Sequence, residues 1–154
     1  MDDKEKLYEK YRTLLGDNPA GVPTTESVRR QFPVWEKYYG RFLPAKHARI
    51  LDIACGCGAA LLWLKERGFH NTEGVDISTE EIKLAHLLGV DEAERADLRE
   101  FLSERRDVYD LIFALDILEH FEKTEIPDIL RLVRRALVPR GLLIIKTPNA
   151  EGIF

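Results

Sequence analysis

The sequence predicts a single α/β domain built on a doubly wound parallel sheet. From about residue 49 to residue 145, short apolar runs alternate with longer segments of helical periodicity. A glycine-rich turn follows the first apolar run and precedes the first of these helical segments, as in units that bind nucleotides. The 154 residues suffice for one domain. We therefore expect parallel strands in the order 3-2-1-4-5, preceded by N-terminal helices.

Two helical segments are predicted ahead of the sheet. Residues 3–15 carry leucine and tyrosine on one face and charged residues opposite, which is typical of an amphipathic helix. A second helical region should run from Thr25, as its N-cap, to Phe42. Pro33 lies inside this region and should break or kink the helix, because proline lacks the N–H that an inner turn needs.

The strands of the sheet and the helices between them are predicted from apolar runs and from the glycine, proline and capping residues that flank them. The strands are expected at Ile50–Ile53, Thr72–Ile77, Glu94–Ala96, Leu111–Ala114 and Leu142–Ile145. The helices between them are expected at Ala59–Arg67, Ser78–Gly89, Leu98–Arg105 and Thr124–Val138. Ser78 and Glu81 have the spacing of a capping box. Pro139 and Gly141 should end the last helix ahead of the fifth strand.

The turn after the first strand reads Asp52-Ile53-Ala54-Cys55-Gly56-Cys57-Gly58. A dinucleotide fingerprint beginning at Gly56 would need a glycine where Leu61 stands. The stretch instead fits the pattern D-x-G-x-G-x-G with alanine in the first glycine position. In this form it resembles the first motif of the class I S-adenosylmethionine-dependent methyltransferases. The alternative is a glycine-rich turn with a purely structural role that binds no ligand.

The resemblance covers nearly everything from Arg41 onward and implies a Rossmann-like core at residues 48–154, capped by an N-terminal helical segment at residues 1–47. It implies S-adenosylmethionine as cofactor and S-adenosylhomocysteine as product. The implied cofactor-binding residues are Asp52, Ala54, Cys55, Gly56, Cys57, Gly58, Asp76, Ile77, Asp97, Leu98, Ala114 and Leu115.

Four of these residues have specific expected roles. Asp52 would face the methionine ammonium group, and Asp76 would accept hydrogen bonds from the ribose hydroxyls. Ile77 would pack on the adenine ring. Asp97 would bind the adenine amino group, although an acid at this position could also simply cap the following helix.

The fourth strand is followed by Asp116-Ile117-Leu118-Glu119-His120. This stretch resembles the Leu-Glu-His segment of small-molecule methyltransferases, including the ubiquinone-biosynthesis O-methyltransferase type. We predict His120 and Asp116 as catalytic residues, with His120 as a general base, because histidine titrates near neutral pH. A structural histidine is the alternative. A metal site with Glu119 is not expected, since no further histidine follows His120.

The acceptor is predicted to be a small molecule. The segment at residues 147–152 resembles methyltransferases that act on sugars or polysaccharide precursors, which implies a sugar hydroxyl. Aromatic residues of the second helical region should pack on the sheet, although Tyr38, Tyr39 or Arg41 could reach the methionine end of the cofactor. A non-catalytic cofactor-binding or interaction module is the second functional hypothesis. An NAD-dependent oxidoreductase is the third, and Leu61 argues against it.

Composition and cysteine content limit which binding partners and which cellular compartment we expect for the protein. A formal net charge of -4 argues against non-specific binding to nucleic acid. Cys55 and Cys57 are too close for an easy disulfide, and free thiols favour the cytoplasm. The sequence shows neither a leader pattern nor an apolar run of transmembrane length, so we expect a soluble protein with no membrane contact.

The fifth strand is expected to be an uncovered edge. The resemblance implies an antiparallel strand pair that closes the sheet, and the sequence up to Phe154 has no residues for it. Leu142–Ile145 is apolar on both faces, and an exposed apolar edge invites pairing. We therefore expect either a homodimer through this edge or a sequence that is a piece of a longer protein.

Overall fold

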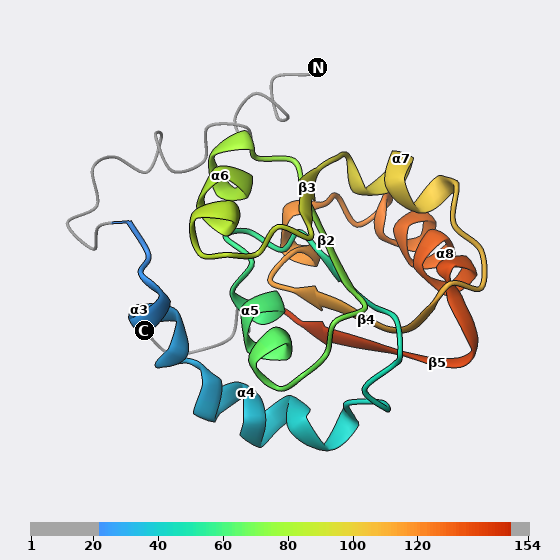
Figure 1. Ribbon diagram of the computed structural model, residues 1–154. Coiled ribbons are helices and arrows are strands. Elements are labelled where there is room, and N and C mark those ends of the chain that lie inside the picture. The colour runs from blue at the N-terminus through green and yellow to red at the C-terminus, as the bar shows by residue number, and fades with distance from the viewer. Residues whose placement is uncertain (1–21, 149–154) are drawn as a thin grey trace.

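The computed structural model describes residues 22–148 and contains one five-stranded parallel sheet (Figure 1). The strand order is β3-β2-β1-β4-β5, which confirms the predicted order. The strands are β1 (Ile50–Ile53), β2 (Thr72–Asp76), β3 (Ala93–Arg95), β4 (Tyr109–Leu115) and β5 (Leu137–Lys146). The helix predicted at residues 3–15 lies outside the described residues.

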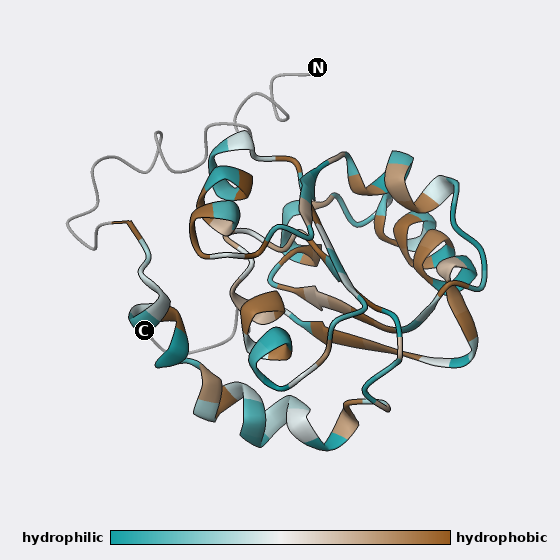
Figure 2. Cartoon of the chain, in the orientation of Figure 1, coloured by the Kyte–Doolittle hydropathy of each residue, from teal (hydrophilic) through white to brown (hydrophobic). Residues whose placement is uncertain are grey.

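Helices cover both faces of this sheet, and their bounds lie within a few residues of the predicted ones. They are α3 (Thr25–Arg29), α4 (Phe32–Tyr39), α5 (Ala59–Glu66), α6 (Thr79–Leu87), α7 (Leu98–Ser103) and α8 (Ile126–Ala136), with short 3-10 turns η1 (Gly40–Phe42) and η2 (Leu118–His120). One buried cluster joins α7 and α8 to one face of the sheet, and two others join α3 to α6 to the opposite face. Figure 2 shows hydrophobic residues along the central strands and on parts of α5 and α8.

Pro33 divides the N-terminal helical region as predicted. It occupies the first turn of α4, where the missing N–H costs nothing, so the chain forms two helices instead of one. The N-cap of α3 is Thr24, one residue before the predicted cap, and its side chain accepts the N–H of Ser27. Thr24 and Ser27 form a reciprocal capping box that the sequence analysis overlooked.

Helix α4 packs across the sheet through its aromatic side chains. The rings of Trp35 and Trp63 meet edge to face at 5.9 Å, and those of Tyr39 and Phe113 do the same at 5.9 Å. Tyr38 is instead 56% exposed. The predicted packing role therefore holds for Trp35 and Tyr39, which join α4 to α5 and β4.

Strand β5 begins at Leu137, five residues earlier than predicted, and the helix predicted to run to Val138 ends at Ala136. The register shifts between the pairs Tyr109–Leu137 and Leu111–Leu142, so the residues between them form a bulge. Arg140 in this bulge has a φ of 70°. Pro139 and Gly141, which were predicted to end the last helix, lie inside strand β5.

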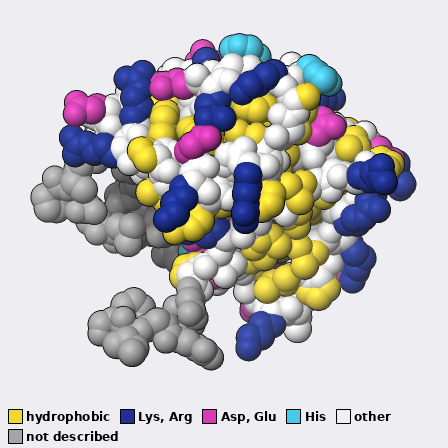
Figure 3. Space-filling view, turned by 90° about the horizontal axis from the view of Figure 1, so that it is seen from below, with side chains coloured by type: hydrophobic (Ala, Val, Ile, Leu, Met, Phe, Trp, Pro, Cys, Tyr) yellow, Lys and Arg dark blue, Asp and Glu magenta, His cyan; other side chains and the backbone are white. Residues whose placement is uncertain are grey.

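Strand β5 forms one edge of the sheet in the described part of the chain. Leu142 is 39% exposed and Ile145 is 44% exposed. Figure 3 views the molecule from the side on which α4 and β5 lie, and hydrophobic side chains gather there among lysines and arginines. Within residues 22–148, no helix is long and apolar enough to cross a membrane.

Candidate functional site

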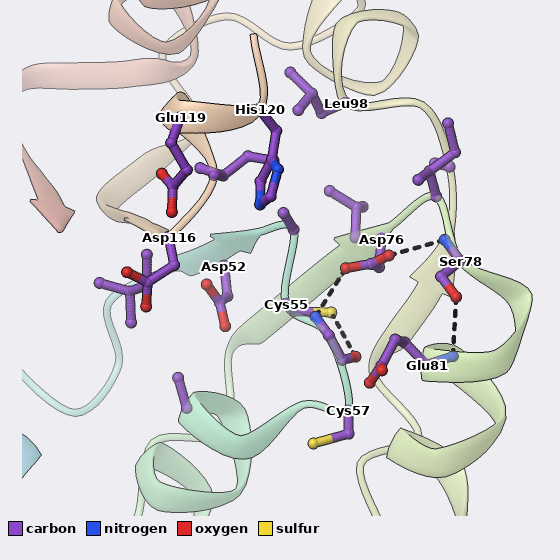
Figure 4. Close-up of a pocket in the computed structure, with 18 of the residues that line it drawn as sticks. Asp52, Cys55, Cys57, Asp76, Ser78, Glu81, Leu98, Asp116, Glu119 and His120 are labelled. Atoms are coloured by element: carbon purple, nitrogen blue, oxygen red, sulfur yellow. Dashed lines mark hydrogen bonds between the residues drawn. The ribbon is translucent and has the colours of Figure 1, made fainter. Parts of the chain in front are cut away.

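A cavity of about 720 Å³ opens at the carboxyl ends of the strands, where ligands bind in open α/β sheets. Its walls come from the glycine-rich loop after β1, the ends of β2, β3 and β4, and the turn η2 (Figure 4). Of the predicted site residues, those lining it are Asp52, Ala54, Cys55, Gly56, Cys57, Asp76, Ile77, Asp97, Leu98, Leu115, Asp116 and His120. Such a volume suits a small organic ligand.

Two predicted cofactor residues do not line the cavity. Ala114 is 2% exposed and belongs to the buried cluster under α7 and α8. Gly58 has a φ of 74° at the N-cap of α5, and a Cβ there would lie 2.9 Å from Cγ1 of Val90. The structure thus places Gly58 where a tight turn and close packing require glycine.

The glycine-rich loop takes a left-handed backbone at alternate residues. Ala54 has a φ of 58° and Gly56 a φ of 53°. Alanine at this angle carries a steric cost that glycine does not, so the first position of the motif is strained in this chain. The loop is tied to β2 because Cys55 N–H donates to the carbonyl of Val75 at 3.0 Å.

Asp76 lies at the end of β2 and holds the loop in place. Its Oδ2 accepts the N–H of Gly56 at 2.9 Å, and its Oδ1 accepts the N–H of Ser78 at 2.8 Å. Burial raises the pKa of Asp76, while these backbone hydrogen bonds oppose that rise. Each oxygen keeps acceptor capacity for a ligand hydroxyl, because a carboxylate offers roughly four acceptor positions.

Asp52 is a buried acid in the wall of the cavity, with 3% of its surface exposed. Burial raises its pKa to about 8, and the neighbouring charge of Asp76 adds to the rise. At neutral pH the carboxyl group therefore holds a proton, and a cation brought beside it would favour its ionised form. This arrangement suits a ligand with a positively charged group.

The sequence suggests two roles for Asp97, capping the following helix and contacting adenine, and the structure shows the first. It caps α7, accepting the N–H of Arg99 at 2.7 Å and of Glu100 at 3.2 Å through one oxygen, Oδ1. It also lines the cavity. The capping role is therefore observed, and contact with an adenine ring stays a prediction.

The opposite side of the cavity carries Asp116, Glu119 and His120, which Figure 4 shows across from Asp76 and Glu81. Asp116 has a φ of 54°, and its carboxylate forms an ion pair with Lys146 at the end of β5. The N–H of Asp116 donates to the carbonyl of Lys146 at 2.8 Å. These contacts fix the chain that leads from β4 into η2, and with it the position of His120.

Several cavity residues were missed by the sequence analysis. Trp35 of α4 lines the cavity, whereas Tyr38, Tyr39 and Arg41, which were considered there, do not. Arg99 and Glu125 form an ion pair of 2.5 Å across the rim, and Arg99 lies 5.1 Å from the centre of the Phe121 ring. No sequence signal connects Arg99 with Glu125. Within residues 22–148, no group of three or more His, Cys, Asp or Glu side chains is arranged to hold a metal ion.

A parallel sheet of this order, with a glycine-rich loop after β1 and acids at successive strand ends, defines a nucleoside-binding α/β protein. The profile of the family described as "Methyltransferase domain" matches residues 28–152. The chain belongs to that family. The core is thus a class I S-adenosylmethionine-dependent methyltransferase domain, as the resemblance of the first motif implied.

Individual relatives agree with this assignment. A ubiquinone biosynthesis O-methyltransferase of Xylella fastidiosa (strain 9a5c) is 32% identical over 125 residues, 76% of this chain and 48% of the relative. The protein of the same name from Xanthomonas oryzae pv. oryzae (strain PXO99A) is 30% identical over 125 residues, 76% of this chain and 50% of that one. The crystal structure of a SAM dependent methyltransferase from Archaeoglobus fulgidus matches with a TM-score of 0.73 and 25% identity, covering 91% of this chain and 59% of that one.

The chain spans about half the length of the curated relatives that it matches. Its cofactor is S-adenosylmethionine, and the residues of the cavity fit that group. The loop backbone leaves open space above Gly56, since a Cβ there would meet only Oε2 of Glu81, at 3.6 Å. Asp52 provides a buried acid that a cation would ionise, and Asp76 provides free acceptor capacity beside the loop.

Proposed function

We propose that this chain transfers the methyl group of S-adenosylmethionine to a hydroxyl oxygen of a small molecule, a sugar or a related metabolite. The observation that carries the proposal is the position of His120, which lines the cavity across from the glycine-rich loop. A histidine on the acceptor side can take the proton of a hydroxyl as the oxygen attacks. The relatives named as O-methyltransferases support an oxygen acceptor.

The cofactor site of the proposal uses the predicted residues that line the cavity. When bound, the cofactor supplies a methyl group on a positively charged sulfur. Asp52 would face its ammonium group, Asp76 would accept from the ribose hydroxyls, and Ile77 would pack against adenine. Asp97 and the N–H of Leu98 would lie at the adenine edge, as the resemblance implies.

The protein's main tasks are to position the acceptor and to exclude water. Asp116, tied to Lys146, would hold the η2 turn so that His120 faces the acceptor oxygen. Trp35 adds an aromatic wall, and Glu119 adds a carboxylate that can accept from further hydroxyls. A flat apolar surface beside acceptor groups suits a ring that carries hydroxyls, which supports a sugar over a wholly apolar acceptor.

Methyl transfer can be tested with S-adenosylmethionine labelled in its methyl group and a panel of acceptors. The panel should contain neutral sugars, polyols and phenols, each paired with an analogue in which the hydroxyl is replaced by hydrogen. We expect label on the hydroxyl-bearing compounds of at least one class. Binding of S-adenosylhomocysteine without transfer to any acceptor would instead support the non-catalytic module.

Three further expectations stay proposals. The N-terminal segment, residues 1–47, would cap the acceptor side of the core at residues 48–154, and α4 with Trp35 supports this arrangement. A homodimer through β5 would cover Leu142 and Ile145, which are exposed on the edge strand. The cytoplasm stays the predicted compartment, because Cys55 and Cys57 are free thiols.

A further inference from the structure

Glu81 is a buried acid in the cavity that the family motifs do not assign. It occupies the first turn of α6, where the sequence predicts a capping box with Ser78. One half of that box is formed, because the Ser78 side chain accepts the N–H of Glu81 at 3.3 Å. The N–H of Ser78, which the second half would use, is donated to Oδ1 of Asp76 at 2.8 Å.

Glu81 lines the cavity, and Figure 4 shows its carboxylate on the side of the glycine-rich loop. Only 9% of the residue is exposed. Its Oε2 lies 3.6 Å from the position that a Cβ would take on Gly56. Asp76 adjoins the same glycine from β2, through the 2.9 Å hydrogen bond to its N–H. A ligand lying over Gly56 would thus have two carboxylates nearby, those of Asp76 and Glu81.

We propose that Glu81 is a second ribose-binding acid, which shares the two ribose hydroxyls of the cofactor with Asp76. Both oxygens of Asp76 already accept a backbone N–H, so its orientation is fixed before the ribose binds. A carboxylate accepts hydrogen bonds from hydroxyl groups, and the ribose offers two adjacent hydroxyls that the two acids can share. The inference rests on the cofactor alone and does not require the acceptor proposed above.

The test compares three ligands on three variants by calorimetry. The ligands are S-adenosylhomocysteine and its 2′-deoxy and 3′-deoxy analogues. The variants are Glu81→Gln, Glu81→Ala and the matched control Glu80→Gln, which removes a charge from the same helical turn at a residue outside the cavity wall. Thermal unfolding of each ligand-free variant checks the fold.

We expect Glu81→Gln to weaken binding of S-adenosylhomocysteine by about tenfold, as for the loss of one hydrogen bond to a charged group. Glu81→Ala should weaken it at least as much, and Glu80→Gln should bind like the wild type. One deoxy analogue, the one that lacks the hydroxyl bound by Glu81, should bind the wild type and Glu81→Gln about equally well.

Two results would overturn the proposal. Wild-type affinity of Glu81→Gln for all three ligands would remove Glu81 from the site. An equal loss for all three would mean that Glu81 shapes the loop and does not touch the ribose. Failure of the wild type to bind S-adenosylhomocysteine would overturn this inference as well, whereas intact binding without methyl transfer would contradict only the proposed function.

Discussion

Asp76 and Gly56 are joined by a hydrogen bond of 2.9 Å that ties the glycine-rich loop to the end of β2. The same carboxylate accepts from Ser78 at 2.8 Å, so one side chain holds both the loop and the start of α6. The residue proposed to bind the ribose thus also sets the geometry of the site before any ligand arrives. Its replacement should affect both functions.

Asp76→Asn should weaken binding of S-adenosylhomocysteine by about 1–3 kcal/mol. The amide would turn its NH₂ group toward one of the two backbone N–H donors, and the ribose would lose an acceptor. Calorimetry would measure the affinity, with Asp91→Asn as a control at an exposed acid. Equal affinity of Asp76→Asn and the wild type would exclude Asp76 from the cofactor site.

Asp52 should make cofactor binding depend on pH. Its pKa of about 8 means that the ligand-free protein must lose a proton before a carboxylate can face the ammonium group. Affinity for S-adenosylhomocysteine should therefore rise as the pH increases toward about 8, with close to one proton released on binding near pH 7. Calorimetry in buffers of different ionisation enthalpy measures that proton. Asp52→Asn should abolish the release, and a wild type that releases none would contradict the prediction.

The same buried acid should influence the stability of the ligand-free protein. In the unfolded chain Asp52 ionises near its ordinary pKa of 3.8, whereas the folded protein keeps the proton up to about pH 8. The unfolded state therefore binds fewer protons in this window, and the free energy of unfolding should fall as the pH rises through it. Asp76, whose pKa burial also raises, acts in the same direction. Urea unfolding from about pH 5 to about pH 8 should show a shallower fall for Asp52→Asn than for the wild type.

Ala54→Gly should stabilise the protein. Ala54 has a φ of 58°, which costs alanine about 1–2 kcal/mol and glycine almost nothing. After the entropy that glycine loses on folding, we expect a net gain of about 0.5–1 kcal/mol, visible in thermal unfolding. Ala85→Gly, in the interior of α6, is the control and should destabilise by about 1 kcal/mol or more. Stabilities that change in the same direction would refute the account of strain at Ala54.

His120→Gln should slow methyl transfer and leave the affinity for S-adenosylhomocysteine unchanged. The histidine lies on the acceptor side of the cavity, and general-base catalysis typically contributes about 10²–10⁴-fold in rate. His70→Gln, at an exposed loop position, is the control. A rate for His120→Gln equal to that of the control would leave His120 with a structural role only.

Much of the fold could be predicted because several local sequence patterns are compatible with only one type of secondary structure. The apolar run at Ile50–Ile53 is too short for a helix and is followed by a tight turn, so a buried strand is the natural outcome. Pro33 divides a helical region for a stereochemical reason that does not depend on the surroundings. The start of β5 at Leu137 could not be found in this way, because the bulge that admits Pro139 depends on pairing with the distant Tyr109.

The cavity residues that lie at the ends of strands could be predicted from the sequence. Those on helices and turns could be predicted less well. Asp76 and Asp97 follow strands that had been located, and parallel strands bring their carboxyl ends to one edge. The ion pair of Arg99 with Glu125 joins residues of separate helical segments, and nothing local marks it. Glu81 had a local explanation as a capping residue, and its position in the cavity wall depends on how the start of α6 lies against the glycine-rich loop.

The buried position of Asp52 also bears on how each catalytic cycle would close. Donor and product would both place an ammonium group beside Asp52, but only the donor would add a positively charged sulfur to the same cavity. With less positive charge nearby, ionised Asp52 returns more readily to its protonated form. The cavity would then bind S-adenosylhomocysteine more weakly than S-adenosylmethionine. The acid that favours binding of the donor would thus also favour release of the product.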